Sequence, residues 1–158
     1  MKSASVSDIK KELKTLPHES LVAVCLRLAK FKVDNKELLT YLLFEADDLP
    51  GYVAAVKAEI DEAFAEINRE KSYPARKKLR KIIRITNKYI RYVGDKETEA
   101  DLLLYICRQM KEAAMVSKRN VQLLNIYMQL LKKAVKAIDT LHEDLQYEYI
   151  RIVNSLDV

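Results

Sequence analysis

Hydrophobic residues recur at alternating three- and four-residue steps along most of the chain, a spacing that predicts amphipathic α-helices rather than strands. The stretch 52–69 is a clear case, because Val53, Val56, Ile60, Phe64 and Ile67 fall on one side of a helix. Similar stripes predict helices over 7–16, from 17 onward, from 34 to 47, from 73 or 74 to 94, and over 98–116. With the C-terminal segment 121–156, we expect an all-α fold of about seven amphipathic helices.

Residues that favour helix ends lie at several of these boundaries. Two predicted starts have the spacing of a capping box, Ser5 with Asp8 and Asp34 with Glu37. Gly94 is suited to a left-handed position after the helix that ends there. Pro17 is predicted to begin the second helix, and Pro50 is predicted to end the third.

The segment 121–156 carries a heptad pattern of apolar residues. The seam positions are Val121, Leu124, Met128, Leu131, Val135, Ile138, His142, Leu145, Tyr149, Ile152 and Leu156. Two interpretations are open: the seam is the spine of the protein's own core, or it mediates self-association or binding of a partner helix. We favour the core, because neighbouring amphipathic helices need a surface to pack on. Because Asp139 and Thr140 are weak helix formers, we expect a break near them.

Several side chains within these patterns are predicted to be buried. Cys25 and Cys107 each fall in an apolar helical pattern, so we expect two core thiols rather than a disulfide. The second helix has apolar residues on more than one side, so we expect it to be covered on more than one side. The sixth helix should bury Leu103, Ile106, Cys107, Met110 and Ala114.

Composition supports a helical domain. The chain has 158 residues, of which 49% are hydrophobic, and a chain of this length fits a single domain over 1–158. It has two Gly and three Pro, too few for the turns of a β-sandwich or barrel. Short connections favour antiparallel neighbours. We expect either an antiparallel helical bundle or a short solenoid-like stack of helical hairpins.

Positive charge is concentrated on the fifth predicted helix. The formal net charge is +5, and residues 71–94 carry nine Lys and Arg and no Asp or Glu. The cations recur at three- and four-residue steps, which places them on one helix face. They could pair with the acidic helix at 52–69, which we favour, or bind nucleic acid or another anionic surface. The candidate contacts are Lys77, Arg80, Lys81, Arg84, Lys88 and Arg91.

Motifs of catalysis and metal binding are not found in the sequence. The two histidines are far apart, His18 predicted to be exposed and His142 partly buried, and no paired Cys or His spacing suggests a zinc site. We therefore expect no enzyme activity, catalytic residue, metal or cofactor. The N-terminus has no signal-peptide core and the longest apolar runs are too short to cross a bilayer, so we expect a cytoplasmic protein without membrane contact.

Three stretches resemble a family of uncharacterised bacterial all-helical proteins, a domain of unknown function. They are the opening DIKKELK at 8–14 with LPHESL at 16–21, then YPARKKLR at 73–80, then GDKETEADLLLY at 94–105. The resemblance covers roughly residues 1–115 and implies an all-α bacterial cytoplasmic protein, without an established activity. Together with the seam, this leads us to expect a non-enzymatic protein–protein interaction or scaffold module; the alternative is nucleic-acid or anionic-surface binding through the basic helix at 74–92.

Overall fold

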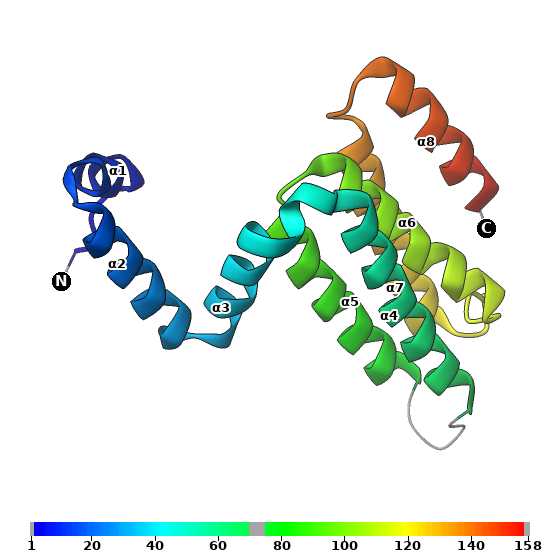
Figure 1. Cartoon of the computed structure of the whole chain (residues 1–158). Helices are drawn as coiled ribbons and strands as arrows, with labels where there is room; N and C mark the ends of the chain where they lie inside the picture. The colour runs from blue at the N-terminus through cyan, green and yellow to red at the C-terminus, as the bar shows by residue number, and fades with distance from the viewer. Residues whose placement is uncertain (1, 70–74, 157–158) are drawn as a thin grey trace. The chain divides into compact units, whose positions relative to one another are not determined.

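The protein is all-α, and the computed structural model describes residues 2–69 and 75–156. These residues form eight α-helices, shown in Figure 1. The chain divides into two compact units, Met1–Glu45 and Ala46–Val158. Whether both belong to the single domain expected from the length stays a prediction.

The first unit contains three short helices, α1 (Val6–Thr15), α2 (His18–Phe31) and α3 (Val33–Thr40), followed by a π-helical turn at Tyr41–Glu45. Ser5 caps α1 as predicted, because its side chain accepts a hydrogen bond from the backbone N–H of Asp8 at 3.2 Å. Pro17 is the residue before α2 rather than its first residue. The predicted capping box at Asp34 is wrong, because α3 begins one residue earlier and its N-cap position makes no side-chain hydrogen bond.

The second unit opens with a 3-10 turn at Ala46–Asp48 that leads into α4 (Leu49–Arg69). Pro50 lies in the first turn of α4 and does not end the preceding helix as expected. A proline is tolerated there because the first N–H groups of a helix have no partner within it. Asp48 stabilises this start by accepting a hydrogen bond from the backbone N–H of Gly51 at 3.0 Å.

The next two helices, α5 (Ala75–Val93) and α6 (Lys96–Glu112), are joined by a tight connection. Gly94 has a φ of +70°, and its N–H donates to the carbonyl of Ile90 at 2.9 Å, which confirms the predicted left-handed end of α5. Asp95 then begins α6 by accepting from the backbone N–H of Thr98 at 2.7 Å. The predicted start of the fifth helix at Tyr73 or Pro74 lies outside the described residues.

The C-terminal end of α6 is a left-handed turn centred on Ala114, which has a φ of +52°. Its N–H donates to Lys111, and the N–H of Met115 donates back to Met110, each at 2.9 Å. This is the two-bond arrangement of a Schellman motif, in which the left-handed position is usually Gly. The expectation of a buried Ala114 in a helix continuing to Val116 is therefore wrong, and Ala114 is exposed.

The last segment breaks as predicted, into α7 (Val121–Ile138) and α8 (Glu143–Leu156). Helix α6 contacts four others, α4, α5, α7 and α8. Its fully or nearly fully buried residues point to more than one side, as expected of a central helix; they are Ala100, Leu102, Leu103, Leu104, Ile106, Cys107 and Met110. A central helix with four neighbours favours a bundle over a solenoid, in which each repeat contacts only the next.

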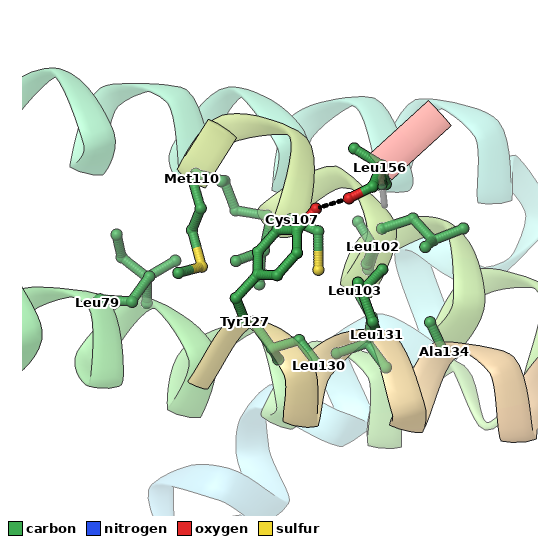
Figure 2. Close-up of a cluster of buried hydrophobic side chains, with 14 of the residues drawn as sticks. Leu79, Leu102, Leu103, Cys107, Met110, Tyr127, Leu130, Leu131, Ala134 and Leu156 are labelled. Carbon is green, nitrogen blue, oxygen red and sulfur yellow. Dashed lines mark hydrogen bonds between the residues drawn. The ribbon is translucent and has the colours of Figure 1, made fainter. Parts of the chain in front are cut away.

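The core of this bundle is built around Tyr127 of α7, which is fully buried (Figure 2). Its ring lies among apolar side chains of α6 and α7, and its hydroxyl donates a hydrogen bond to the carbonyl oxygen of Leu156. Because that oxygen is at the end of α8, the hydrogen bond fastens the last helix to the core. A buried hydroxyl needs such a partner to avoid a desolvation cost.

Candidate functional site

The cations of α5 lie on the side of the helix opposite its buried stripe, which consists of Leu79, Ile82, Thr86 and Ile90. Of the six predicted anion contacts, Lys77, Arg80, Lys81, Arg84 and Arg91 are exposed and Lys88 is half-buried. At 100° per residue the two sets fall on opposite faces. The predicted helix over 77–91 is confirmed, while contact of its cations with an anion stays a prediction.

One groove, of about 740 Å³, lies between α4 and α5. Three carboxylates of α4 and four cations of α5 line it, so the charges nearly balance; they are Glu59, Glu62, Glu66, Lys77, Lys78, Lys81 and Arg84. Tyr89 donates a hydrogen bond to Glu59 at 2.9 Å. This α4–α5 groove brings the acidic and basic helices side by side, while ion pairing between their charges stays a prediction.

A second groove, of about 910 Å³, lies between α5, the start of α6, and α7. Five cations line this α5–α7 groove, against the two carboxylates Asp95 and Glu99; they are Arg80, Arg84, Arg91, Lys96 and Lys133. Arg84 lines both grooves. Sequence reasoning missed Lys96 and Lys133, because they lie on other helices and only the packing brings them beside α5.

Glu99 connects the two lysines of the α5–α7 groove. Its carboxylate accepts from Lys96 at 2.6 Å and lies 3.4 Å from the ammonium of Lys133, which also donates to Asn87 at 2.6 Å. Burial acts to raise the pKa of Glu99, but the hydrogen bond from Lys96 and the two positive charges outweigh it and hold the pKa below its ordinary value. Glu99 is therefore ionised at neutral pH and neutralises part of the lysine charge.

A polar cluster on the other side of α6 joins it to α4. Lys57 lies 2.7 Å from the carboxylate of Asp101 and 5.2 Å from the centre of the Tyr105 ring. The Tyr105 hydroxyl donates to both oxygens of Asp61, at 2.7 and 2.8 Å. Burial and this carboxylate raise the pKa of Tyr105 to about 12. All these groups are paired with one another, so the cluster holds the two helices together and offers no open site.

The first unit presents many large apolar side chains to solvent. We call this set the N-terminal apolar surface; it comprises Val6, Ile9, Leu13, Val22, Val24, Leu26, Leu28, Phe31, Val33, Leu42, Leu43 and Phe44. The exposed fraction reaches 83% for Val6 and 79% for Phe44, and Tyr41 is the buried hydrophobic side chain among the described residues of this unit. The expectation that α2 is covered on more than one side is wrong, because none of its residues is buried. The expectation of a core thiol at Cys25 is also wrong, because this residue is exposed.

The heptad seam is divided between core and surface. Leu131, Ile138 and Leu156 are buried, whereas Val121, Met128 and Val135, spaced seven residues apart, are exposed. The buried face of α7 is rotated away from the seam and includes Leu123, Tyr127, Leu130 and Ala134. His142, predicted to be partly buried, lies in the connection before α8 with its side chain exposed, 3.4 Å from Asp144. His18 is exposed, as predicted.

The described residues include few groups suited to metal binding or nucleophilic catalysis. Within residues 2–69 and 75–156, no cluster of three or more His, Cys, Asp or Glu side chains is placed to hold a metal ion. Cys107 is fully buried, and desolvation raises its pKa to about 12. A thiol with that pKa stays protonated at neutral pH and is a poor nucleophile.

No helix in the described part of the chain has the length and hydrophobicity needed to cross a membrane. Comparison with protein-family models finds no match, and no curated protein or solved structure is significantly similar to the chain. The resemblance of residues 1–115 to an uncharacterised bacterial family stays a prediction.

Proposed function

We propose that the protein is a non-enzymatic interaction module that self-associates through the N-terminal apolar surface. The observation that supports this proposal is the exposure of twelve large hydrophobic side chains in a unit of 45 residues. Exposed large apolar side chains in this number, concentrated on one small unit, are typical of interaction sites.

The first unit is too small and too open to be stabilised by its own core. Segments of about 40 residues usually need disulfides, metals or oligomerisation to fold. Burying one Val, Leu, Ile or Phe side chain contributes about 1.5–3 kcal/mol, and this unit buries only Tyr41 among its described hydrophobic residues. Covering the N-terminal apolar surface would supply the missing stabilisation.

A second copy of the same chain is the occupant that we favour. Most soluble oligomers are symmetric assemblies in which the same patch of each copy meets its counterpart. Residues 1–45 carry eight Lys and Arg and six Asp and Glu, so two copies of the unit bring little mutual repulsion. The exposed side chains Val6, Ile9 and Leu13 follow one face of α1, as helix pairing requires.

Sedimentation velocity over a range of protein concentrations tests the proposal. The wild type should sediment as a dimer or larger species, and the triple variant Leu28→Gln, Phe31→Gln and Phe44→Gln should shift to monomer. The matched control is Val121→Gln, Met128→Gln and Val135→Gln, which changes exposed apolar residues of the second unit. The control should sediment like the wild type.

Two results would contradict the proposal. A wild type that stays monomeric at the highest soluble concentration leaves the first unit without a second copy to cover it. A monomeric control with a dimeric N-terminal variant would move the interface to the exposed part of the heptad seam. Circular dichroism of the control should show wild-type helix content, since only exposed side chains are changed. The N-terminal variant should keep the helices of the second unit, and any loss of helix content should be confined to the first unit, because the monomer no longer covers its apolar side chains.

A further inference from the structure

The basic residues of α5 divide between two grooves of different charge, and this division indicates where an anion would bind. In the α4–α5 groove, four cations lie with three carboxylates. In the α5–α7 groove, five cations lie with two carboxylates, and both carboxylates already have partners: Asp95 accepts from Thr98, and Glu99 from Lys96. The α5–α7 groove therefore has the uncompensated positive charge.

Three arginines account for that charge. Within the described residues, Arg80, Arg84 and Arg91 form no ion pair or side-chain hydrogen bond. They lie within about 40° of one another around α5 and span about 16 Å along it, from 1.5 Å per residue. All three are exposed and line the same groove. Guanidinium groups in such a row can each bind a phosphate with two hydrogen bonds.

From this geometry we propose that the α5–α7 groove binds the phosphodiester backbone of nucleic acid through Arg80, Arg84 and Arg91. One strand of duplex DNA carries a phosphate about every 3.4 Å along the axis. The row of arginines is therefore long enough to contact several successive phosphates. Lys133, on α7 across the groove, adds a cation on the opposite wall.

Two features favour a nucleic-acid backbone over a membrane surface. The arginines line a groove, which receives a rod-shaped polyanion more readily than a flat layer of headgroups. The other groove of α5 holds Glu59, Glu62 and Glu66, which repel an anionic surface laid across the whole helix. Among the described lining residues of the α5–α7 groove there is no aromatic side chain, so the contacts favour backbone over stacked bases.

Fluorescence anisotropy with short labelled duplex DNA, duplex RNA and single-stranded DNA tests the proposal, between about 50 and 200 mM salt. The wild type should bind, with a slope of log affinity against log salt of about −2.7 for three duplex phosphates at 0.9 each. The variant Arg80→Gln, Arg84→Gln and Arg91→Gln should lose at least about tenfold in affinity. Its salt slope should fall towards zero.

The matched control is Lys77→Gln, Lys78→Gln and Lys81→Gln, which removes the same charge from the same helix but from the α4–α5 groove. It should keep affinity within about threefold and keep most of the salt slope. Equal losses in the two variants, or no wild-type binding at about 50 mM salt, would overturn the proposal. Binding to anionic phosphatidylserine vesicles but to none of the three nucleic acids would overturn it as well. These variants leave the N-terminal apolar surface intact, so the result is independent of self-association.

Discussion

The hydrogen bond from Tyr127 to Leu156 permits a quantitative test of how α8 is held. In Tyr127→Phe the ring remains and only the buried hydroxyl is lost, so the carbonyl of Leu156 loses its donor in a site where the residue is 4% exposed. Leaving a buried acceptor unsatisfied costs about 1–3 kcal/mol. With a urea m-value of about 2 kcal/mol/M, a loss of about 2 kcal/mol lowers the unfolding midpoint by about 1 M.

Tyr147→Phe is the matched control, because it removes the same hydroxyl group from a tyrosine that lies on α8 itself and is 69% exposed. Its free energy of unfolding should stay within about 0.5 kcal/mol of the wild type, as for other surface changes. Hydrogen exchange in α8 should accelerate in Tyr127→Phe and not in the control. If both variants have the same midpoint and the same exchange in α8, the hydroxyl does not hold this helix and the reasoning is refuted.

Two further predictions concern the left-handed turns and pH. Gly94→Ala should destabilise the second unit by about 1 kcal/mol, because its φ is +70°; steric contact does not contribute, since no atom lies within 4 Å of the added methyl group. Ala114→Gly, at φ +52°, should stabilise the unit by a similar amount. Urea unfolding that gives the two changes in stability the same sign would contradict this. The pKa of Glu99 in the folded protein is below its ordinary value of 4.5, so its stabilisation is present above pH 4.5 and is lost as the pH falls through the folded pKa. As the pH is lowered through this range, the urea midpoint should fall more steeply for the wild type than for Glu99→Gln. Parallel curves would argue against the Lys96–Glu99–Lys133 linkage.

The sequence predicts α4 and α5 well because the apolar stripe of each helix lies on one side. Val56, Ile60 and Phe64 of α4 and Leu79 and Ile90 of α5 are all buried as their spacing requires. Such stripes are reliable when the opposite face is charged, since only one orientation then buries the apolar residues. The left-handed conformation of Gly94 is also predicted by its residue type.

The face of α7 could not be predicted in the same way. This helix has apolar residues on most of its circumference. Four of the five residues from 123 to 127 are apolar or aromatic, and the fifth is Asn125. A heptad and a 3.6-residue period then fit equally well over a few turns. The choice that exposes Met128 and Val135 is made by packing against α6, which local sequence does not encode.

Two other features could not be predicted from the sequence. Ala114 has a left-handed conformation in which Gly is the usual residue, so its residue type does not indicate that α6 ends there. The α5–α7 groove joins residues 80–91 to Lys96 and Lys133, and only helix packing brings these positions together. The six-residue cationic face was therefore predictable, while its division into a balanced and an unbalanced groove was not.

Self-association through residues 2–45 is tested most directly by energy transfer between copies labelled at Cys25. This thiol is exposed on α2, whereas Cys107 is fully buried and unreactive, so the natural sequence offers one labelling position in the first unit. Mixing donor- and acceptor-labelled protein should give transfer that rises with concentration and disappears in the variant Leu28→Gln, Phe31→Gln and Phe44→Gln. Absence of transfer at every concentration, or transfer that persists unchanged in that variant, would contradict the proposed interface.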